Sequence, residues 1–246
     1  MDKALYVAMT GASATLKAQS AVANNLANID TTGFKAALVQ TEAYAVQGPG
    51  LPSRVDATLK GPGFDASPGP LIQTGNELDV AVRDGHWLVV MDAAGQEAYT
   101  RAGSLQINAN GQLVTASGLQ VMGQGGPISV PPNQSVTLAA DGTLSIVPAG
   151  QSPATQAQVG RVRVVQADGA ALVRGGDGLM RMADGSTPPN AAGNVLTTGV
   201  LEGSNVNAAQ SLVEMIELSR QFDMQVRVLH SADENARAAN SLLRLG

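Results

Sequence analysis

The sequence contains no cysteine, and it has few aromatic residues. Among its 246 residues there are one Trp, three Tyr and three Phe, so aromatic residues make up 3% of the chain. The lack of cysteine excludes disulfides, thiol catalysis and cysteine metal sites. The scarcity of large rings predicts a core built from many small contacts. Hydrophobic residues reach 44%, which is ordinary for a folded protein.

Basic charge and long apolar runs are also scarce. The formal net charge is −5 and the isoelectric point is about 4.9, whereas nucleic-acid binding calls for a basic patch. We therefore expect no nucleic-acid partner. The longest notable apolar run is Trp87–Met91, far short of the roughly 20 residues that cross a bilayer, so we expect no membrane span. The opening MDKALYVAMTGASA reads into an amphipathic pattern, so we expect no cleaved Sec-type signal.

Glycine and proline are nearly absent from the two ends of the chain. All 12 prolines lie within residues 49–189, and 26 of the 28 glycines lie within residues 33–203. Both residue types break helices, so their absence predicts long helices over residues 1–30 and 205–245. Chain ends are usually where disorder concentrates, so two helical ends suggest elements used in assembly.

Each predicted helix carries an apolar seam. The first seam has steps of three and four residues and comprises Leu5, Met9, Ala12, Leu16, Ala23 and Leu26. The second has residues seven apart, namely Met215, Phe222, Leu229, Ala236 and Leu243, with Leu212 and Val226 at the other seam position. A heptad sustained over about five repeats indicates coiled-coil packing. Asn207, with Gln210 three residues later, predicts the start of the second helix.

Two kinds of packing are open for these helices. They can pack on each other or on the body of the same chain, or they can bury their seams against neighbouring chains. The first helix has few charges and many small, mildly polar residues, which favours burial among other helices. We therefore expect the ends to order on assembly.

The middle of the chain reads as β structure. Residues 86–91 predict a strand, and hairpins are predicted where 105–107 and 113–115 flank Asn108–Gly111 and where 136–138 and 144–146 flank Asp141-Gly142. Val159–Val165 predicts a further strand. Short strands with frequent turns suggest a meandering sheet or a small barrel-like domain. Five prolines within residues 49–70 predict an extended connector.

The residues that could carry catalysis do not form a recognisable set. His86 and His230 are the only histidines, and each is better explained by packing or surface exposure. No zinc-protease, phosphate-loop, serine-elbow or EF-hand spacing occurs. Isolated Asp-Gly pairs are usually turns, and Trp87 is expected in the core. We predict no enzyme activity, no metal and no cofactor.

Two motifs at opposite ends of the chain resemble those of bacterial flagellar axial proteins, the rod and hook proteins. Ala23-Asn24-Asn25-Leu26-Ala27-Asn28 followed by Thr32-Gly33-Phe34-Lys35 is similar to the family's N-terminal signature. Leu201-Glu202-Gly203-Ser204-Asn205-Val206-Asn207 is similar to the element that precedes its last helix. The resemblance covers about 80 residues and extends more loosely to Arg101–Ser104 and Asn110–Val114.

The resemblance implies a structural subunit of the flagellar basal-body rod that transmits torque from motor to hook. Its implied partners are copies of itself, proximal rod neighbours, the distal rod protein and the flagellar export apparatus. Its implied place is the basal body across the periplasm, reached by type III export. The chain length suits two rod proteins of this family, the distal rod protein and one other rod protein. The segment Arg220–Gln225 resembles the second of these more than the distal rod protein. A secreted β-domain binding protein is the alternative from another class.

The prediction is an α+β chain in which long N- and C-terminal helices, with a coiled-coil-like core, bracket a β-rich central domain. Its parts are an assembly helix at 1–32, an extended connector at 33–77, a β-rich outer domain at 78–200 and an assembly helix at 201–246. The predicted assembly interface comprises Leu5, Met9, Leu16, Asn24, Asn25, Leu26, Asn28, Gly33, Phe34, Asn205, Val206, Leu212, Met215, Phe222, Val226 and Leu229. Gly33 is expected in the cap region after the first helix, and the asparagines are expected to bond backbone groups at helix ends and bends.

Overall fold

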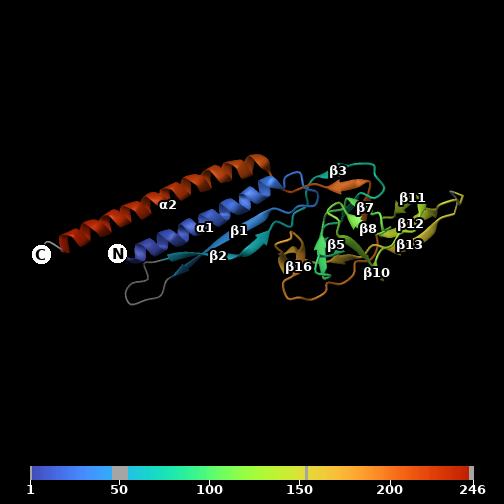
Figure 1. Ribbon diagram of the computed structural model, residues 1–246, viewed down its shortest axis with the longest axis horizontal. Helices are drawn as coiled ribbons and strands as arrows, with labels where there is room; N and C mark the ends of the chain where they lie inside the picture. Colours follow the sequence, from blue (N-terminus) through green and yellow to red (C-terminus); the bar gives the residue numbers. More distant parts are fainter. Residues whose placement is uncertain (1, 46–54, 153–154, 244–246) are drawn as a thin grey trace. The chain divides into compact units, whose positions relative to one another are not determined.

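The computed structural model describes residues 2–45, 55–152 and 155–243 (Figure 1). In this part of the chain, helix α1 spans Asp2–Ala27 and helix α2 spans Ala208–Leu243. The chain divides into two compact units. The helical unit comprises Met1–Ala27, Ala37–Gly63 and Asn207–Gly246, and the β unit comprises Asn28–Ala36 and Phe64–Val206.

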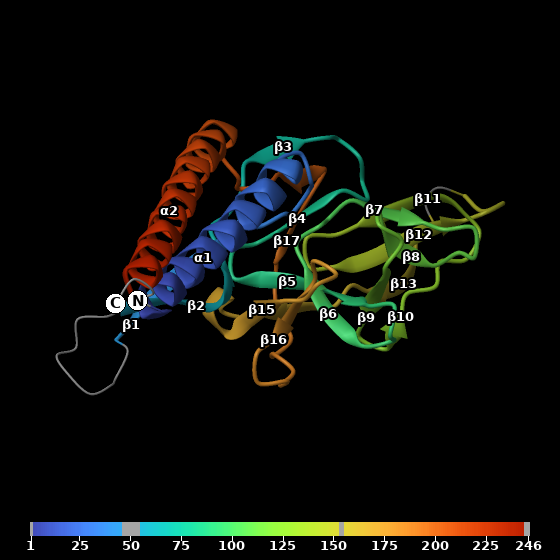
Figure 2. The same cartoon turned by 60° about the vertical axis from the view of Figure 1, so that its left-hand side comes forward.

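The helical unit is an antiparallel pair of helices with a β-hairpin beside it. Figures 1 and 2 both show α1 and α2 side by side, with the two chain ends at the same end of the pair. The pair is closely packed at Gly11, where an added Cβ would lie 3.3 Å from the Gln225 amide nitrogen. The Thr15 hydroxyl lies 3.1 Å from Gln225 Oε1. The hairpin is formed by β1 (Ala37–Ala45) and β2 (Val55–Phe64), and β1 contacts α1.

The predicted start of the second helix is confirmed. The Gln210 amide donates to Asn207 Oδ1 at 3.2 Å, so Asn207 caps α2 from the position before its first residue. At the other helix, Asn25 ties the last turn of α1 to β1. Its side chain accepts from the Ala37 amide at 2.7 Å and donates to the Ala37 carbonyl at 3.0 Å.

The β unit is built from one large antiparallel sheet and three small ones. Seven strands of the large sheet follow the order β15-β16-β6-β5-β9-β8-β7, while β10 pairs with β9 and β14 pairs with β5. The small sheets are β11-β12-β13, β17-β4 and β18-β3. The strands are β3 (Leu71–Gln73), β4 (Val80–Val82), β5 (His86–Met91), β6 (Glu97–Thr100), β7 (Leu105–Ile107), β8 (Leu113–Thr115), β9 (Gln120–Gly123), β10 (Gly126–Pro127), β11 (Asn133–Leu138), β12 (Thr143–Pro148), β13 (Ala157–Arg161), β14 (Val164–Gln166), β15 (Leu172–Arg174), β16 (Met180–Met182), β17 (Leu196–Thr198) and β18 (Val200–Glu202), with a 3-10 turn at Gly169–Ala171.

The hydrophobic core lies in the β unit, and β5 passes through its centre. Alternate residues of a strand point to opposite faces. Leu88 and Val90 belong to the larger buried cluster, whereas Trp87 and Val89 belong to the smaller one. Because both faces are covered, the strand reads as a continuous apolar run. Trp87 is 2% exposed, which confirms its predicted place in the core.

The fold-class prediction was wrong in its coiled-coil-like helical core. Helices contain 26% of the residues and strands contain 35%, and neither buried apolar cluster includes a helical residue. On α1 the large residues of the predicted seam are exposed, since Met9 is 55% and Leu16 is 46% exposed, although Ala12 of the same seam is buried. The other buried apolar positions are taken by Ala14 and Val22, which lie outside the seam. The period was visible in the sequence, but several faces of this helix have similar polarity, so the period did not identify the buried face.

The predicted hairpins are confirmed. β7 pairs with β8 around Asn108–Gly111, and β11 pairs with β12 around Asp141-Gly142. The predicted strand over Val159–Val165 is divided between β13 and β14. Within the range 33–77, which the sequence predicts to be an extended connector, the described residues form strands β1, β2 and β3. Residues 46–54 of this range lie outside the described residues.

Candidate functional site

The two family-like motifs meet in the β unit around a buried cluster of three charges. Lys35 Nζ donates to Glu202 Oε1 at 2.7 Å, and Arg101 Nε donates to Glu202 Oε2 at 2.6 Å. The side chains of Lys35 and Glu202 are 1% exposed and that of Arg101 is 2% exposed. These three residues are called the triad below. They come from the segment after α1, from the loop after β6 and from the last residue of β18.

Backbone groups satisfy the remaining donors of the triad. Lys35 Nζ also donates to the Ser67 carbonyl at 2.6 Å, and Arg101 Nη2 donates to the Val82 carbonyl at 2.9 Å. Burial lowers the pKa of Lys35, although the contact with Glu202 opposes this. Taking ions out of water costs several kcal/mol each, and only close partners repay that cost. The triad therefore joins three segments in an arrangement that tolerates little displacement.

Asn205 bonds the same segments from the C-terminal side. Its Oδ1 accepts from the Ala36 amide at 2.7 Å, while Nδ2 donates to the carbonyls of Asp65 and Ser67 at 3.0 and 3.1 Å. An asparagine side chain has one acceptor and two donor hydrogens, so a single residue can join separate strands in this way. Its predicted role of bonding backbone groups near a helix end fits these contacts.

Gly33 and Phe34 complete this region, which we call the junction (Gly33, Phe34, Lys35, Arg101, Arg174, Glu202 and Asn205). The Gly33 amide donates to the Glu202 carbonyl at 2.7 Å. Its φ is +69°, and an added Cβ would lie 2.3 Å from the Arg101 carbonyl carbon. Gly33 is therefore required for close packing in the β unit. It does not cap α1, which ends at Ala27.

Arg174, at the end of edge strand β15, lies against Phe34. Its guanidinium carbon is 4.6 Å from the centre of the Phe34 ring, and its Nη2 donates to the Lys35 carbonyl. Such a guanidinium–ring contact is attractive and is stronger where water is excluded. Burial lowers the pKa of Arg174.

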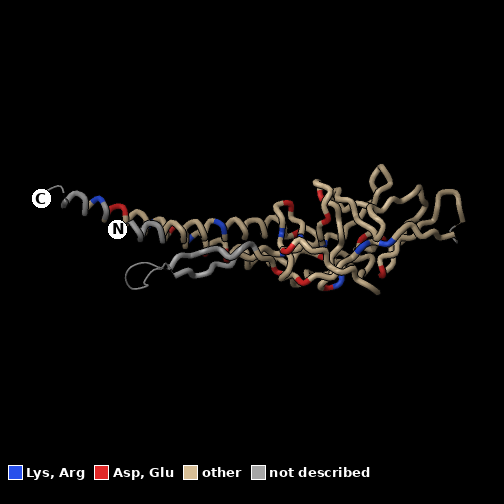
Figure 3. Tube along the Cα trace, turned by 90° about the horizontal axis from the view of Figure 1, so that it is seen from below, with Lys and Arg blue, Asp and Glu red and all other residues tan. Residues whose placement is uncertain are grey.

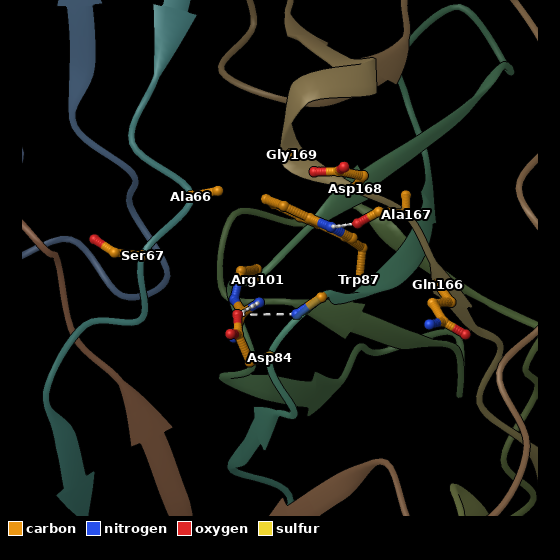
Figure 4. Close-up of a pocket in the computed structure, with 10 residues that line it drawn as sticks. Ala66, Ser67, Asp84, Trp87, Arg101, Gln166, Ala167, Asp168 and Gly169 are labelled. Carbon is orange, nitrogen blue, oxygen red and sulfur yellow. Dashed lines mark hydrogen bonds and ion pairs between the residues drawn. The ribbon is translucent and has the colours of Figure 1, made fainter.

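Arg101 also forms part of the wall of a cavity of about 440 Å³ (Figure 4). Its guanidinium lies 5.5 Å from the centre of the Trp87 ring, and Trp87 Nε1 donates to the Ala167 carbonyl at 3.2 Å. The lining consists of Ala66, Ser67, Asp84, Gly85, Trp87, Arg101, Gln166, Ala167, Asp168 and Gly169. Figure 4 shows Asp84 beside Arg101 and Asp168 on the far side of the Trp87 ring. This lining lacks a nucleophile paired with a base, so it does not favour catalysis.

The predicted interface residues on α1 fall on different faces. The side chain of Leu5 lies outside the described residues, while Met9, Leu16 and Asn24 are exposed. Asn25 is buried against β1, as described above, and Leu26 is half-buried. Just beyond the helix, Asn28 Oδ1 accepts from the Thr31 hydroxyl at 3.1 Å.

On α2, the predicted residues are half-buried at four positions, namely Met215, Phe222, Val226 and Leu229. The fifth, Leu212, is 49% exposed. Val206 is half-buried between the junction and the helix. The structure thus brings Gly33, Phe34 and Asn205 together. The predicted residues of α1 lie on different faces, whereas four of the five on α2 share its half-buried face.

The sequence prediction did not include the charged residues of the junction. Lys35, Arg101 and Glu202 stand within the motifs of the resemblance but were not predicted as site residues. Their signal is charge within otherwise apolar or small-residue motifs, in a chain that is only 14% charged. Arg174 had no such signal, because nothing near it in the sequence marks it.

Within the described ranges, no group of three or more His, Cys, Asp or Glu side chains is arranged to hold a metal ion. Neither of the two helices in this part of the chain has an apolar stretch of the length that a bilayer crossing requires.

Three family models match separate parts of the chain. The model described as flagella basal body rod protein matches residues 5–35. The flagellar hook protein FlgE/F/G D1 domain matches residues 81–146, and the flagellar basal body rod FlgEFG protein C-terminal model matches residues 197–242. The first and last matches include the two motifs that form the junction.

Whole-length relatives carry names from the same family. The flagellar basal-body rod protein FlgF of Escherichia coli (strain K12) is 44% identical over 253 residues, covering 100% of both chains. FlgF of Salmonella typhimurium is 43% identical over 251 residues, again covering 100% of both. FlgG of Agrobacterium fabrum is 30% identical, covering 98% of this chain and 100% of the relative. Similarity is thus greater to these FlgF proteins than to this FlgG protein.

Proposed function

Because the chain belongs to the flagellar basal-body rod protein FlgF family, we propose that it assembles through the outward faces of α1 and α2. The protein is a structural subunit of the bacterial flagellar basal-body rod and not an enzyme. One observation carries the proposed mode of assembly: α2 has apolar residues on two opposite faces. The inward face packs on α1, and the outward face has no partner among the described residues.

The two faces of α2 follow from helical geometry. Successive residues are about 100° apart around a helix. Ile216, Met224 and Val228 therefore fall within about 120° of one another, together with Val213, and we call these four residues the outer stripe. They are 55–59% exposed. Met215, Phe222 and Leu229, on the half-buried inner face, lie on the opposite side of the helix.

Helix α1 offers a matching outward surface. Met9 and Leu16 are seven residues apart, so they lie on one face, and they are 55% and 46% exposed. Between Ala8 and Ala27 the helix has one charged residue, Lys17. Figure 3 shows that most of the described backbone of the two helices has the colour of uncharged residues. Contiguous exposed apolar surface marks an interaction site. The proposed contact places the outward face of α1 from one subunit on the outer stripe of α2 from a neighbour.

Charge is distributed in a way that supports this proposal. The helical unit has eight acidic and eight basic residues, so it is neutral. The β unit has 12 acidic and seven basic residues and carries the whole net charge of −5. Like charges repel across a contact between copies, so a neutral unit is the better candidate for repeated close packing.

We further propose that segments 1–32 and 201–246 are the assembly core and that 78–200 forms the outer domain. The predicted interface then has two parts with different tasks. Residues on the outward faces, such as Met9, Leu16 and Leu212, contact neighbours. The junction residues Gly33 and Asn205 hold the segments that lead into the helices. Torque would pass between subunits through helix contacts shared along the rod.

The proposed partners are copies of this chain, other rod proteins and the flagellar type III export apparatus. Family membership supports the rod partners, and export through this apparatus is the corresponding route to a basal body that crosses the periplasm. Mass spectrometry of the subunit from purified basal bodies tests the route. An intact Met1 or loss of that methionine alone is expected, whereas removal of a longer N-terminal segment would contradict export without cleavage.

The outer stripe can be tested by placing a charge on it. Ile216→Asp adds a carboxylate to a position that is exposed in the single chain, so the isolated subunit should fold normally. In the rod, the same carboxylate would be buried without a partner, which is costly. Expressed in a strain lacking the native gene, the variant should fail to restore swimming, and purified basal bodies should lack the subunit.

Leu71→Asp is the matched control. Leu71 is 65% exposed, but it lies on β3, away from both helices in the sequence. It should restore swimming as the unchanged chain does. Normal swimming and normal incorporation of Ile216→Asp would refute assembly through the outer stripe.

A further inference from the structure

Arg174 is a half-buried cation without an acidic partner in the described part of the chain. Arg101, Arg163 and Arg181 reach carboxylate oxygens at 2.5–2.6 Å. Arg174 has none, and its Nε is buried without any hydrogen-bond partner. A guanidinium removed from water costs free energy unless an anion compensates it.

The local charge balance points in the same direction. The junction has three cations, Lys35, Arg101 and Arg174, for one buried carboxylate, Glu202. Asp84 lies 3.8 Å from Arg101 and compensates that side. Burial alone accounts for the lowered pKa of Arg174, with no nearby acid opposing it. The uncompensated charge is therefore concentrated at Arg174.

The guanidinium is held in place before any partner arrives. It is stacked on the Phe34 ring, and its Nη2 is bound to the Lys35 carbonyl. The turn that follows Arg174 is open to solvent: Gly176 is exposed, and an added Cβ there would have no heavy atom within 4 Å. Arginine and aromatic residues are enriched at interfaces, where a fixed, weakly hydrated guanidinium binds carboxylates with little loss of entropy.

We propose that Arg174 receives a carboxylate from a second copy of this chain in the assembled rod. This inference rests on the proposed function, because it requires neighbouring copies. Charge complementarity identifies the occupant. The β unit has 12 acidic and seven basic residues and exposes carboxylates such as that of Glu77. The attraction is local to Arg174 and acts against the general repulsion between acidic units.

The proposed contact has a direction. In a helical rod each subunit stands in the same relation to the next, so each would give a carboxylate to one neighbour and receive one from another. Such a head-to-tail contact can extend along a helical filament. It would add a charged contact in the β unit to the apolar contacts of the helices.

Site-specific photocrosslinking tests the occupant. A benzophenone amino acid at Gly176, in the exposed turn two residues after Arg174, should crosslink two copies of this chain in purified basal bodies. The crosslinked peptide of the second copy should contain or adjoin an Asp or Glu. The same group at Ile216, on the outer stripe, reports separately on the proposed function. Crosslinks at Ile216 but none at Gly176 would overturn this inference alone, and none at either site would count against both. A crosslink from Gly176 to a different protein would also overturn it.

Two variants separate docking from a role in folding. Arg174→Met removes a poorly compensated charge while keeping an apolar contact to Phe34, so the thermal midpoint of the isolated chain should stay close to that of the unchanged chain. Incorporation into basal bodies should fall about tenfold, the effect of losing roughly 1.4 kcal/mol of association free energy. Arg174→Lys keeps the charge but lacks the planar guanidinium, so its incorporation should lie between that of the unchanged chain and that of Arg174→Met. A lowered midpoint with normal incorporation would show a structural role and overturn the proposal.

Discussion

Removing the negative charge of Glu202 should destabilise the β unit severely. In Glu202→Gln, the amide keeps one acceptor for two buried cations, and its NH₂ group faces one of them. Lys35 and Arg101 would then lie 1–2% exposed without a buried counter-charge, since Asp84, 3.8 Å from Arg101, is 72% exposed. The Gly69 amide, which donates to Glu202 Oε1 at 3.0 Å, would compete for the remaining oxygen.

The expected loss is about 3–5 kcal/mol, the usual cost of breaking a buried ion pair by removing one partner. Domains are stable by only about 5–15 kcal/mol, so this is a large fraction of the total. For a unit of this size, it corresponds to a fall of about 6–20 °C in thermal midpoint. Glu97→Gln is the matched control, because Glu97 pairs with Arg163 at 2.5 Å but is 37% exposed. The control should lose less than about 1 kcal/mol.

The assay is urea unfolding followed by tryptophan fluorescence and by circular dichroism. Trp87 is the only tryptophan, and it lies in the β unit, so its emission reports on that unit. Circular dichroism is needed as well, because Arg101 lies over the Trp87 ring and its movement alone can change the emission. Equal losses for Glu202→Gln and Glu97→Gln would refute the reasoning about the triad. Adding Lys35→Met to Glu202→Gln should recover part of the loss, since it removes an unpaired charge.

Three further predictions concern single positions. Gly33→Ala should cost at least about 2 kcal/mol more than Gly75→Ala in urea unfolding, because both glycines have positive φ but only Gly33 would bring a Cβ to 2.3 Å from backbone; equal losses would contradict the close packing. Asn205→Ala should cost about 1–3 kcal/mol and speed hydrogen exchange of the Ala36 amide, which the side chain bonds at 2.7 Å; unchanged exchange would contradict this. Arg181→Gln should destabilise more at pH 7 than near pH 2.5, because Arg181 lowers the pKa of Asp92 and Asp177 in the folded chain. The resulting stability is fully present above their ordinary pKa of about 4 and is lost as the pH falls through their lowered folded-state pKa. An equal difference in urea midpoint at both pH values would contradict the linkage.

The local elements were largely predictable from the sequence. Asn207 and Gln210 mark the start of α2, and the structure has the bond between them. The hairpin around Asp141-Gly142 was predictable from turn residues between alternating strands. The run from His86 to Met91 predicted a strand, and the structure has β5 there. These elements were predictable because they depend on residues close together in the sequence or on the polarity of single residues.

The candidate site was predictable only in part. The motifs located Gly33, Phe34 and Asn205, but the role of Gly33 was assigned to a helix cap. Its actual neighbour is the backbone at Arg101, which is distant in the sequence. Arg174 reaches Phe34 only because β15 lies at the edge of the large sheet, and no local pattern encodes that placement.

The sequence by itself determined that two helical ends enclose a β-rich body and that two motifs border those ends. It did so because propensity, turn chemistry and periodicity act over a few residues. Only the tertiary structure decided which faces of α1 and α2 are buried and which remain exposed for a partner. It alone joined Lys35, Arg101 and Glu202, since pairing charges so far apart in the chain depends on strand order and register. Burial gives those charges a large effect on stability, because the free energy of an ion depends on whether water can reach it.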